Sequence, residues 1–241
     1  MKRRLEGANE RLDAAVHDPD ELAQSLDQVA AVNRFLGGAR ALRLALAALM
    51  QGRRTLSILD VGCGSGDLPR AVAEDLRSRG VDARITAADL HPQILVLARQ
   101  RLGRSEAIDL ARLDARDLPF AANSFDVALM SLTLHHFEGR DTVRVLREMG
   151  RVARMVVIND LDRAWPNYLG ARLLARTLWA GNRLTRHDGP LSVLRAFTAG
   201  ELAALGHAAG LTHVHVQRRF FYRLVMTARS ASPAAHSTVA K

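Results

Sequence analysis

Three glycines at alternate positions, Gly62, Gly64 and Gly66, follow an apolar segment that contains Asp60. Glycine lets a backbone turn tightly and approach a ligand where a side chain would collide, and a helix that starts after such a turn offers free N–H groups. Asp60 would repel a pyrophosphate but could hold an ammonium group. The spacing is not that of a dinucleotide loop, and no Gly-Lys-Ser/Thr follows, so a nucleoside triphosphate loop is excluded.

Two more carboxylates follow at the ends of the next expected strands. Asp89 comes 23 residues after Gly66, where an acidic side chain could accept hydrogen bonds from both hydroxyls of a ribose. Asp114 is followed by Ala115 and other apolar residues, a setting in which an adenine could donate its amino hydrogens and stack. The alternatives are that Asp89 caps the helix that starts near Pro92 and that Asp114 only forms a turn.

Three histidines are candidates for acid–base chemistry. His135 and His136 follow the fourth expected strand, at the sheet edge where open α/β sheets bind ligands, and His187 precedes Asp188 in a segment expected to cover that edge. A neutral imidazole is a credible general base for a phenol or an enol. Alternatively, one of the paired histidines packs against or caps the next helix, and His187 lies in a solvated turn.

Strands and helices that alternate along the chain must position these residues. Short apolar runs predict strands at residues 55–61, 84–89, 108–113, 125–132 and 155–159, and amphipathic stretches predict helices near 68–79, 92–102 and 140–152. Strands separated by helices form βαβ units, so we expect a Rossmann-like α/β fold, a three-layer sandwich around a mostly parallel sheet.

The flanking segments are expected to be helical before this alternation and mixed after it. The first 50 residues predict helices, with a start at Asp18-Pro19 and a second helix at 39–50. Residues 162–184 predict an amphipathic helix or helix pair, and a turn at Gly189-Pro190 and a helix near 198–209 follow. Strands at 212–217 and 221–228 are so close that only an antiparallel hairpin can join them.

Composition and charge narrow the function classes. The net charge is +9, yet Lys2 and Lys241 are the only lysines, and the arginines are spread through every segment. Dispersed arginines with 5% aromatic residues argue against a nucleic-acid surface. A single cysteine, Cys63, excludes an internal disulfide and a cysteine-based zinc cluster, and the two histidines His213 and His215 lack a third ligand, so no metal is expected. Without a signal peptide or a membrane span, we expect a cytoplasmic protein.

The succession of these motifs closely resembles the class I S-adenosylmethionine-dependent methyltransferases, in the small-molecule branch related to ubiquinone/menaquinone biosynthesis and natural-product O-methyltransferases. The resemblance covers roughly residues 55–228. It implies a seven-stranded sheet with an antiparallel last strand and S-adenosylmethionine as the cofactor. The implied cofactor-binding residues are those of the glycine loop and of three strand ends: Asp60, Gly62, Cys63, Gly64, Gly66, Asp89, Leu90, Asp114, Ala115 and Ser131.

One departure from that family lies at the fifth strand, which lacks the usual Pro-Gly-Gly turn before it and ends in Asn159-Asp160-Leu161. We divide the chain into an N-terminal helical cap (1–54), a methyltransferase domain (55–229) with a helical lid insertion at about 162–190, and a flexible tail (230–241).

The function expected from the sequence is methyl transfer to an oxygen of a hydrophobic small molecule in secondary metabolism. Transfer to an enol-type carbon is the close alternative, because the same base could generate either nucleophile. A nucleotide-cofactor oxidoreductase and a non-catalytic or RNA-modifying module are disfavoured. We expect no nucleic-acid partner and no stable membrane insertion, and the sequence leaves a homodimer open.

Overall fold

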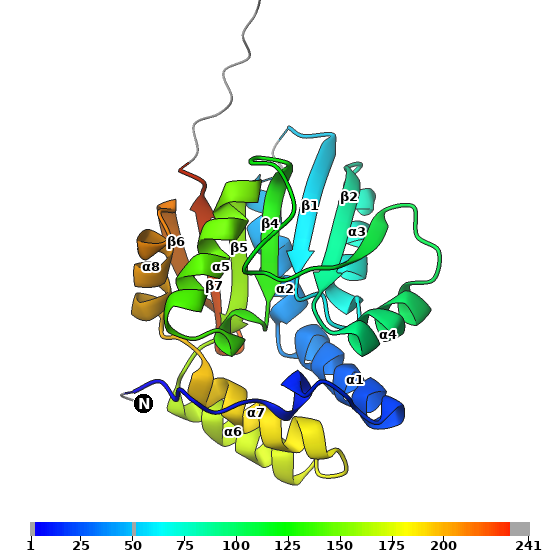
Figure 1. The fold of residues 1–241 in the computed structure, drawn as a ribbon, viewed down its shortest axis with the longest axis vertical. Coiled ribbons are helices and arrows are strands. Elements are labelled where there is room, and N and C mark those ends of the chain that lie inside the picture. Colours follow the sequence, from blue (N-terminus) through cyan, green and yellow to red (C-terminus); the bar gives the residue numbers. More distant parts are fainter. Residues whose placement is uncertain (1–2, 50–51, 232–241) are drawn as a thin grey trace, which may run out of the picture.

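In the computed structural model, which describes residues 3–49 and 52–231, the chain folds around one seven-stranded sheet (Figure 1). The strand order is β3-β2-β1-β4-β5-β7-β6. β7 pairs antiparallel with both β5 and β6, while the other neighbouring strands pair parallel. The predicted fold class and the antiparallel last strand are therefore confirmed. The strands are β1 (Thr55–Val61), β2 (Asp82–Asp89), β3 (Ile108–Arg112), β4 (Phe125–Ser131), β5 (Ala153–Leu161), β6 (Thr212–Arg219) and β7 (Arg223–Arg229).

Helices cover both faces of the sheet and its carboxyl edge (Figure 1). They are α1 (Pro19–Phe35), α2 (Gly38–Leu49), α3 (Asp67–Ser78), α4 (Pro92–Leu102), α5 (Gly139–Val152), α6 (Trp165–Arg176), α7 (Arg183–Arg195) and α8 (Ala199–Ala208). Two short 3-10 turns, η1 (Arg11–Asp13) and η2 (Leu134–His136), lie near the carboxyl edge.

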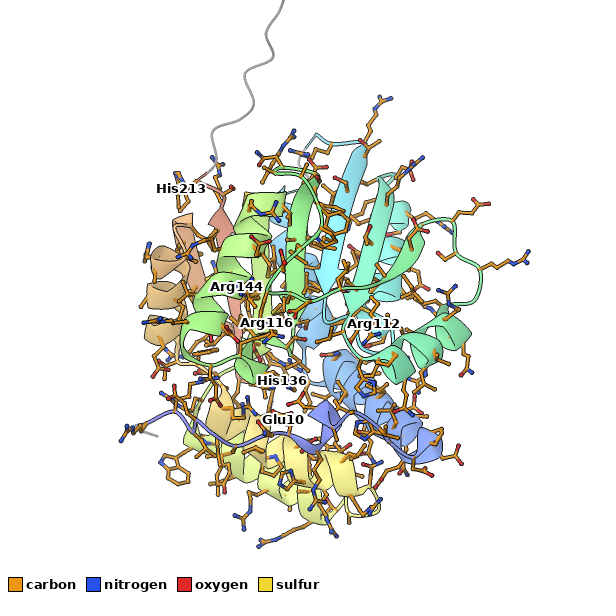
Figure 2. All side chains as sticks on the ribbon, viewed as in Figure 1. Glu10, Arg112, Arg116, His136, Arg144 and His213 are labelled. Carbon is orange, nitrogen blue, oxygen red and sulfur yellow. The ribbon has the colours of Figure 1, made fainter. Side chains whose placement is uncertain are left out.

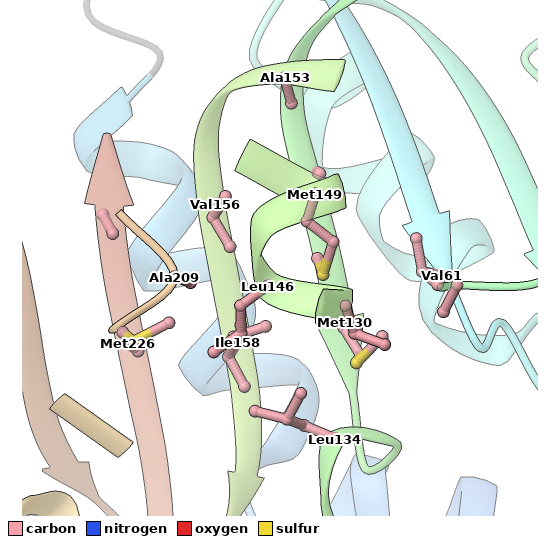
Figure 3. Packing of buried hydrophobic residues seen from close by; sticks show 14 of the residues in the cluster. Val61, Met130, Leu134, Leu146, Met149, Ala153, Val156, Ile158, Ala209 and Met226 are labelled. Carbon is pink, nitrogen blue, oxygen red and sulfur yellow. The ribbon is translucent and has the colours of Figure 1, made fainter. Parts of the chain in front are cut away.

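Apolar side chains at alternate positions of the strands are buried in two layers, one on each face of the sheet. On one face Met130, Val156 and Ile158 pack against Leu146 and Met149 of α5 (Figure 3). Apolar residues of α8 complete this layer. On the other face the strands pack against apolar residues of α2, α3 and α4. These layers make the sheet rigid, so the residues at its carboxyl edge are held in fixed positions.

The carboxyl ends of the parallel strands point toward α1, α6 and α7, which lie together below the sheet in Figure 1. α6 and α7 come from the segment that the sequence predicts as a helical lid. In this arrangement the loops that follow β1, β2 and β4 face the helices across one space, which is where ligands of open α/β sheets bind.

The N-terminal residues 3–18, which we call the strap, differ from the helices expected there. α1 begins only after Asp18, whose side chain accepts hydrogen bonds from Asp20 and Glu21 N–H groups. Before it the chain runs across α7 with the η1 turn as its single helical turn (Figure 1). Side chains from elsewhere in the protein accept hydrogen bonds from the backbone of the strap, as Glu138 does from the Gly7 N–H group. The backbone N–H groups therefore have partners without forming a helix.

The predicted turn at Gly189-Pro190 is wrong, because both residues lie inside α7. Asn182 caps this helix by accepting hydrogen bonds from the Leu184 and Thr185 N–H groups. Gly189 lies against Trp179, whose ring carbon would be 2.4 Å from a Cβ at that position. Tertiary packing therefore keeps a helix where the local sequence favours a turn.

The remaining sequence expectations differ only at boundaries. The β6–β7 hairpin is confirmed, with its connection at residues 220–222. Met50 at the end of the second expected helix and residues 232–241 of the expected flexible tail lie outside the described residues. Among the helices of residues 3–49 and 52–231, none is long and apolar enough to cross a membrane.

Candidate active site

One cavity of about 1090 Å³ lies between the carboxyl edge of the sheet, the strap and the helices α1, α6 and α7. Most of the residues predicted for the site line it: Gly62, Cys63, Gly64, Asp89, Leu90, Asp114, Ala115, Ser131, His135 and His136. Of the predicted residues, Asp60, Gly66 and His187 are not part of its lining. The topology thus brings the glycine loop, two of the strand-end carboxylates and the histidine pair to one space.

Glycine is required at the three positions of the loop for different structural reasons. All three have positive φ, 78° at Gly62, 55° at Gly64 and 79° at Gly66. A Cβ at Gly62 would collide with Thr133, and a Cβ at Gly66 would collide with Leu102. A Cβ at Gly64 would meet no atom within 4 Å. Gly64 is therefore the position where the loop exposes backbone to the cavity, and the other two serve the close packing of the turn.

Asp89 ties the glycine loop to the end of β2. Its Oδ2 accepts a hydrogen bond from Gly64 N–H at 3.1 Å, and its Oδ1 accepts from His91 N–H at 3.0 Å. Burial raises the pKa of Asp89, while the hydrogen bonds from the backbone oppose that shift. Each carboxylate oxygen has capacity for one more donor, as the two hydroxyls of a ribose require. His91, not Asp89, is the cap of α4, so the alternative capping role of Asp89 is wrong.

Asp60 and Asp67 add two carboxyl groups around the same loop. Asp60 is buried at the end of β1, and its burial, followed by the nearby Asp67 and Asp89 carboxylates, raises its pKa well above the ordinary value. Asp67 lines the cavity and accepts hydrogen bonds from Asn33 and Ser65. A group of buried carboxylates favours a bound cation over an anion. The donor set therefore fits a ligand with positively charged ammonium and sulfonium groups, and Asp60 acts on it from beneath the loop.

Three further predicted residues have partners within the protein. The Asp114 carboxylate pairs with the Arg116 guanidinium at 2.8 Å, and this hydrogen bond lowers the pKa of Asp114. Ser131 Oγ accepts a hydrogen bond from Asn159 Nδ2 at 2.9 Å. Burial raises the pKa of the Cys63 thiol, so it remains protonated and unreactive at neutral pH. Asp114 must share its oxygens with Arg116 if it is to receive an adenine amino group.

His135 is buried between two carboxylates. Its Nδ1 lies 2.7 Å from Asp160 Oδ1, and its Nε2 lies 3.4 Å from Glu10 Oε1. Burial alone would lower the pKa of His135, but Asp160 and Glu10 raise it to about 10. A general base must be unprotonated, so the geometry does not support the base role expected of His135. Its imidazolium holds the strap to β5 instead.

His136 has a different environment: its Nδ1 contacts a carboxylate, and its Nε2 makes no hydrogen bond with the described residues, 3–49 and 52–231. Its Nδ1 lies 2.9 Å from Asp13 Oδ1, and its Nε2 is 3.6 Å from Glu10 Oε2. Glu10 and Asp13 both come from the strap, which crosses below His136 in Figure 2. A carboxylate that accepts from Nδ1–H directs the lone pair of Nε2 outward, which is the arrangement of an oriented base.

The third predicted histidine, His187, does not line the cavity. Its Nδ1 lies 2.7 Å from Asp188 Oδ1, as the sequence suggested. Asp188 also accepts hydrogen bonds from the Arg11 and Leu12 N–H groups at 2.8 and 2.9 Å. The Asp188 carboxylate therefore fastens the strap to α7, and the geometry does not support His187 as the base.

Sequence reasoning missed four residues of the cavity region: Glu10, Asp13, Asp160 and Arg223. Arg223 is buried and lines the cavity, and its Nη1 has no hydrogen-bond partner among residues 3–49 and 52–231. An unpaired buried guanidinium nitrogen favours an oxyanion nearby, such as a carboxylate or a phenolate. The unusual Asn159-Asp160-Leu161 end of β5 was the one sequence signal that pointed to any of these residues.

The fold and the similarity to known proteins support a class I S-adenosylmethionine-dependent methyltransferase. Residues 58–155 match the family described as "Methyltransferase domain". The chain is similar to the ubiquinone/menaquinone biosynthesis C-methyltransferase UbiE of Nitrosospira multiformis, with 31% identity over 112 residues, 45% of this chain and 44% of that protein.

A demethylmenaquinone methyltransferase of Tropheryma whipplei is 31% identical over 160 residues, which cover 61% of this chain and 64% of that protein. The chain spans about half the length of the curated relatives that it matches first.

Solved structures share the fold at low sequence identity. Human N-acetylserotonin methyltransferase in complex with SAM has a TM-score of 0.64 and 16% identity, covering 89% of this chain and 57% of that one. A SAM-dependent methyltransferase from Aquifex aeolicus has a TM-score of 0.62 and 17% identity, covering 89% of this chain and all of that one (100%). These likenesses concern the fold alone.

Proposed function

We propose that this protein transfers the methyl group of S-adenosylmethionine to an oxygen of a hydrophobic small molecule, a phenol or enol of the polyketide- or quinone-like kind, in secondary metabolism. The single observation that carries the proposal is that Gly64, Asp89 and His136 line one cavity. A cofactor cradle and an oriented imidazole in the same space are what methyl transfer to a weakly acidic hydroxyl requires.

The cofactor is assigned to the loop between β1 and α3. The open backbone at Gly64, the free acceptor capacity of Asp89 and the carboxyl groups of Asp60 and Asp67 all suit a cationic nucleoside. Bound there, S-adenosylmethionine would supply a methyl group that its sulfonium sulfur already activates. The protein then has to position the acceptor, exclude water and remove one proton.

The apolar part of the cavity is assigned to the acceptor. Its lining includes six apolar residues from β5, the helices α6 and α7, the turn between these helices and the β6–β7 connection: Leu161, Leu173, Leu174, Trp179, Val193 and Phe221. Burial of a ring or chain against such residues stabilises binding by roughly 25 cal/mol for each Å² removed from water. Polar acceptors without an apolar body would gain little from this surface.

Proton removal is assigned to His136. Asp13 holds its Nδ1 at 2.9 Å, and Nε2 faces the cavity region near Glu10. When the acceptor hydroxyl donates to Nε2, the Asp13 carboxylate stabilises the imidazolium that forms. His135 and Asp160 contribute indirectly, because they hold Glu10 and the strap in place.

Methyl transfer to an enol-type carbon is the second candidate. The observation that favours it is the activity for which the relatives are named, a C-methyltransferase of ubiquinone and menaquinone biosynthesis among them. The same base generates either nucleophile, since removing the proton of an enol places charge on both oxygen and carbon.

Calorimetry with S-adenosylhomocysteine and, separately, with NAD is the test of the cofactor assignment. We expect saturable binding of S-adenosylhomocysteine and none of NAD, and the reverse would support an oxidoreductase. Methyl transfer is then measured with isotopically labelled S-adenosylmethionine and a panel of alkylresorcinols and naphthohydroquinones. The position of the new methyl group, read by nuclear magnetic resonance, separates the two candidates: a methyl ether supports O-transfer, and a ring methyl supports C-transfer.

A further inference from the structure

The carboxylate of Glu10 faces the Nε2 atoms of two histidines. Oε1 lies 3.4 Å from Nε2 of His135, and Oε2 lies 3.6 Å from Nε2 of His136. Ligand atoms of the three residues all lie within 4.8 Å of one another. All three residues line the cavity, and the Glu10 and His135 side chains are only 3% and 2% exposed. Two imidazole nitrogens and a carboxylate oxygen that converge in this way are a donor set for a divalent transition metal.

The opposite nitrogen of each ring is held by a second carboxylate. Nδ1 of His135 lies 2.7 Å from Asp160, and Nδ1 of His136 lies 2.9 Å from Asp13. A histidine that binds a metal almost always donates its other N–H to a carboxylate, a carbonyl or water, which fixes the ring and directs the free nitrogen to the metal. Both histidines have such a partner, and this observation is independent of where their Nε2 atoms point.

An ion pair alone explains only part of this geometry. A protonated His135 would satisfy one oxygen of Glu10, and Ser192 Oγ also donates to Oε1 at 2.9 Å. Nε2 of His136 lies 3.6 Å from the same carboxylate, and an ion pair there would require a second imidazolium beside that of His135, with the two ring centroids only 4.6 Å apart. A cation between the three groups accounts for the convergence of all of them.

We infer that Glu10, His135 and His136 bind one divalent cation of the zinc class, with the fourth coordination position open to the cavity. Nitrogen donors favour zinc or cobalt over magnesium, which prefers oxygen ligands in an octahedral arrangement. The carboxylates of Glu10, Asp13 and Asp160 supply the negative charge that a dication requires. The cation takes the place of the proton that His135 carries without it, so binding releases this proton to solvent. Three protein ligands leave one position for water or an acceptor oxygen.

The cation and the proposed base compete for the same lone pair. Coordination uses Nε2 of His136, so a loaded protein cannot take the acceptor proton there. We therefore expect the cation to inhibit methyl transfer, and this consequence rests on the proposed function. The inference of a metal site does not rest on the proposed function, because metal binding can be measured without any methyl acceptor.

The full-length protein, treated with a chelator and desalted, is titrated with Co²⁺ and followed by its visible absorption, and with Zn²⁺ by calorimetry. We expect one bound ion per chain with an absorption spectrum of low-coordinate cobalt. Glu10→Gln and His136→Asn should lower the affinity at least roughly 100-fold, and Asp160→Asn, which removes an outer partner, roughly 10- to 100-fold. His207→Asn, an exposed histidine on α8, is the matched control and should bind as the wild type does.

S-adenosylhomocysteine binding by each variant shows that it is folded. Absence of saturable Co²⁺ and Zn²⁺ binding by the wild type would overturn the inference, as would equal affinity in folded Glu10→Gln and His136→Asn proteins. If the cation binds at these residues but one equivalent of Zn²⁺ leaves methyl transfer unchanged, the metal site stands and the inhibitory consequence is refuted. If no methyl transfer is found for any acceptor, the titrations still decide the metal site.

Discussion

Nδ1 of His136 lies 2.9 Å from Oδ1 of Asp13, so a residue of the strap orients a residue that follows β4. Glu10 of the same strap is buried, and the neighbouring His136 and His135 lower its pKa to about 2 against the opposing effect of burial. A segment without regular secondary structure therefore completes the polar part of the cavity. Its contacts with Asp188 and Glu138 fix where Asp13 and Glu10 stand.

Replacing His136 by Gln should lower the rate of methyl transfer by roughly 10²- to 10⁴-fold, because the proton acceptor is lost. Affinity for S-adenosylhomocysteine should stay within a factor of a few, because no proton leaves an acceptor in that equilibrium. Asp13→Asn should lower kcat and leave KM nearly unchanged, since it only orients the ring. Steady-state kinetics on the identified acceptor gives both values. Near wild-type kcat in folded His136→Gln would remove this histidine from catalysis.

Gly64→Val should abolish binding of S-adenosylhomocysteine, because its side chain would stand where the backbone meets the cofactor. Gly210→Val is the matched control: both glycines have positive φ, 55° and 83°, and neither would place a Cβ within 4 Å of another atom. Both variants carry comparable backbone strain of about 1–2 kcal/mol. Calorimetry should therefore separate them, and equal binding by the two would show that the loop is only a turn.

The parts of the fold that local patterns determine were predictable. Alternating apolar runs and amphipathic stretches located the five strands and three helices of the βαβ region, because each pattern follows from burial on one face or both. The positions of the glycine loop and of Asp89 were predictable for a similar reason, because both follow from the local sequence: the spacing of the glycines and the end of a strand. The hairpin of β6 and β7 followed from its short connection alone.

The strap and its residues were not predictable, because distant side chains hold it. Glu10 and Asp13 meet His135 and His136 only after the sheet, α7 and the strap have assembled. The choice among the histidines also depends on this assembly. It surrounds His135 with carboxylates and leaves Nε2 of His136 without a hydrogen bond to any part of the chain that the structure describes. Asp188 pairs with His187 and in addition holds the strap, a contact that the local sequence does not indicate.

Asp89→Asn should weaken binding of S-adenosylhomocysteine by about 1–3 kcal/mol, because the ribose hydroxyls lose a charged acceptor. Asn is preferred to Ala, which would also leave Gly64 and His91 N–H groups without their acceptor. The 2′-deoxy analogue of S-adenosylhomocysteine is measured with both proteins, so that the loss of the carboxylate and the loss of the hydroxyl can be compared. The wild type should bind this analogue more weakly than the parent compound, and the variant should distinguish the two much less. An unchanged preference in the variant would place the ribose elsewhere.

Burial of the Asp60 carboxyl group should destabilise the protein in the absence of ligand. Its pKa is raised above the ordinary 3.8 by burial and then by Asp67 and Asp89, so the folded protein holds a proton that the unfolded chain has already released. The contribution of Asp60 to the free energy of unfolding is therefore most favourable below pH 3.8. It becomes less favourable as the pH rises from there through the raised pKa of the folded protein. Asp60→Asn removes this dependence, so at pH 7 the variant should be more stable by on the order of 1 kcal/mol or more.

Urea unfolding of both proteins between pH 4.5 and 8 measures this effect, with Asp109→Asn on the exposed side of β3 as the control. The advantage of Asp60→Asn should shrink toward low pH, where the wild-type carboxyl is also neutral. It should shrink again when S-adenosylmethionine is added, because the cationic ligand offsets the buried charge in the wild type alone. A variant that is less stable at pH 7 and equally stabilised by the ligand would mean that Asp60 braces the loop and does not attract the cofactor.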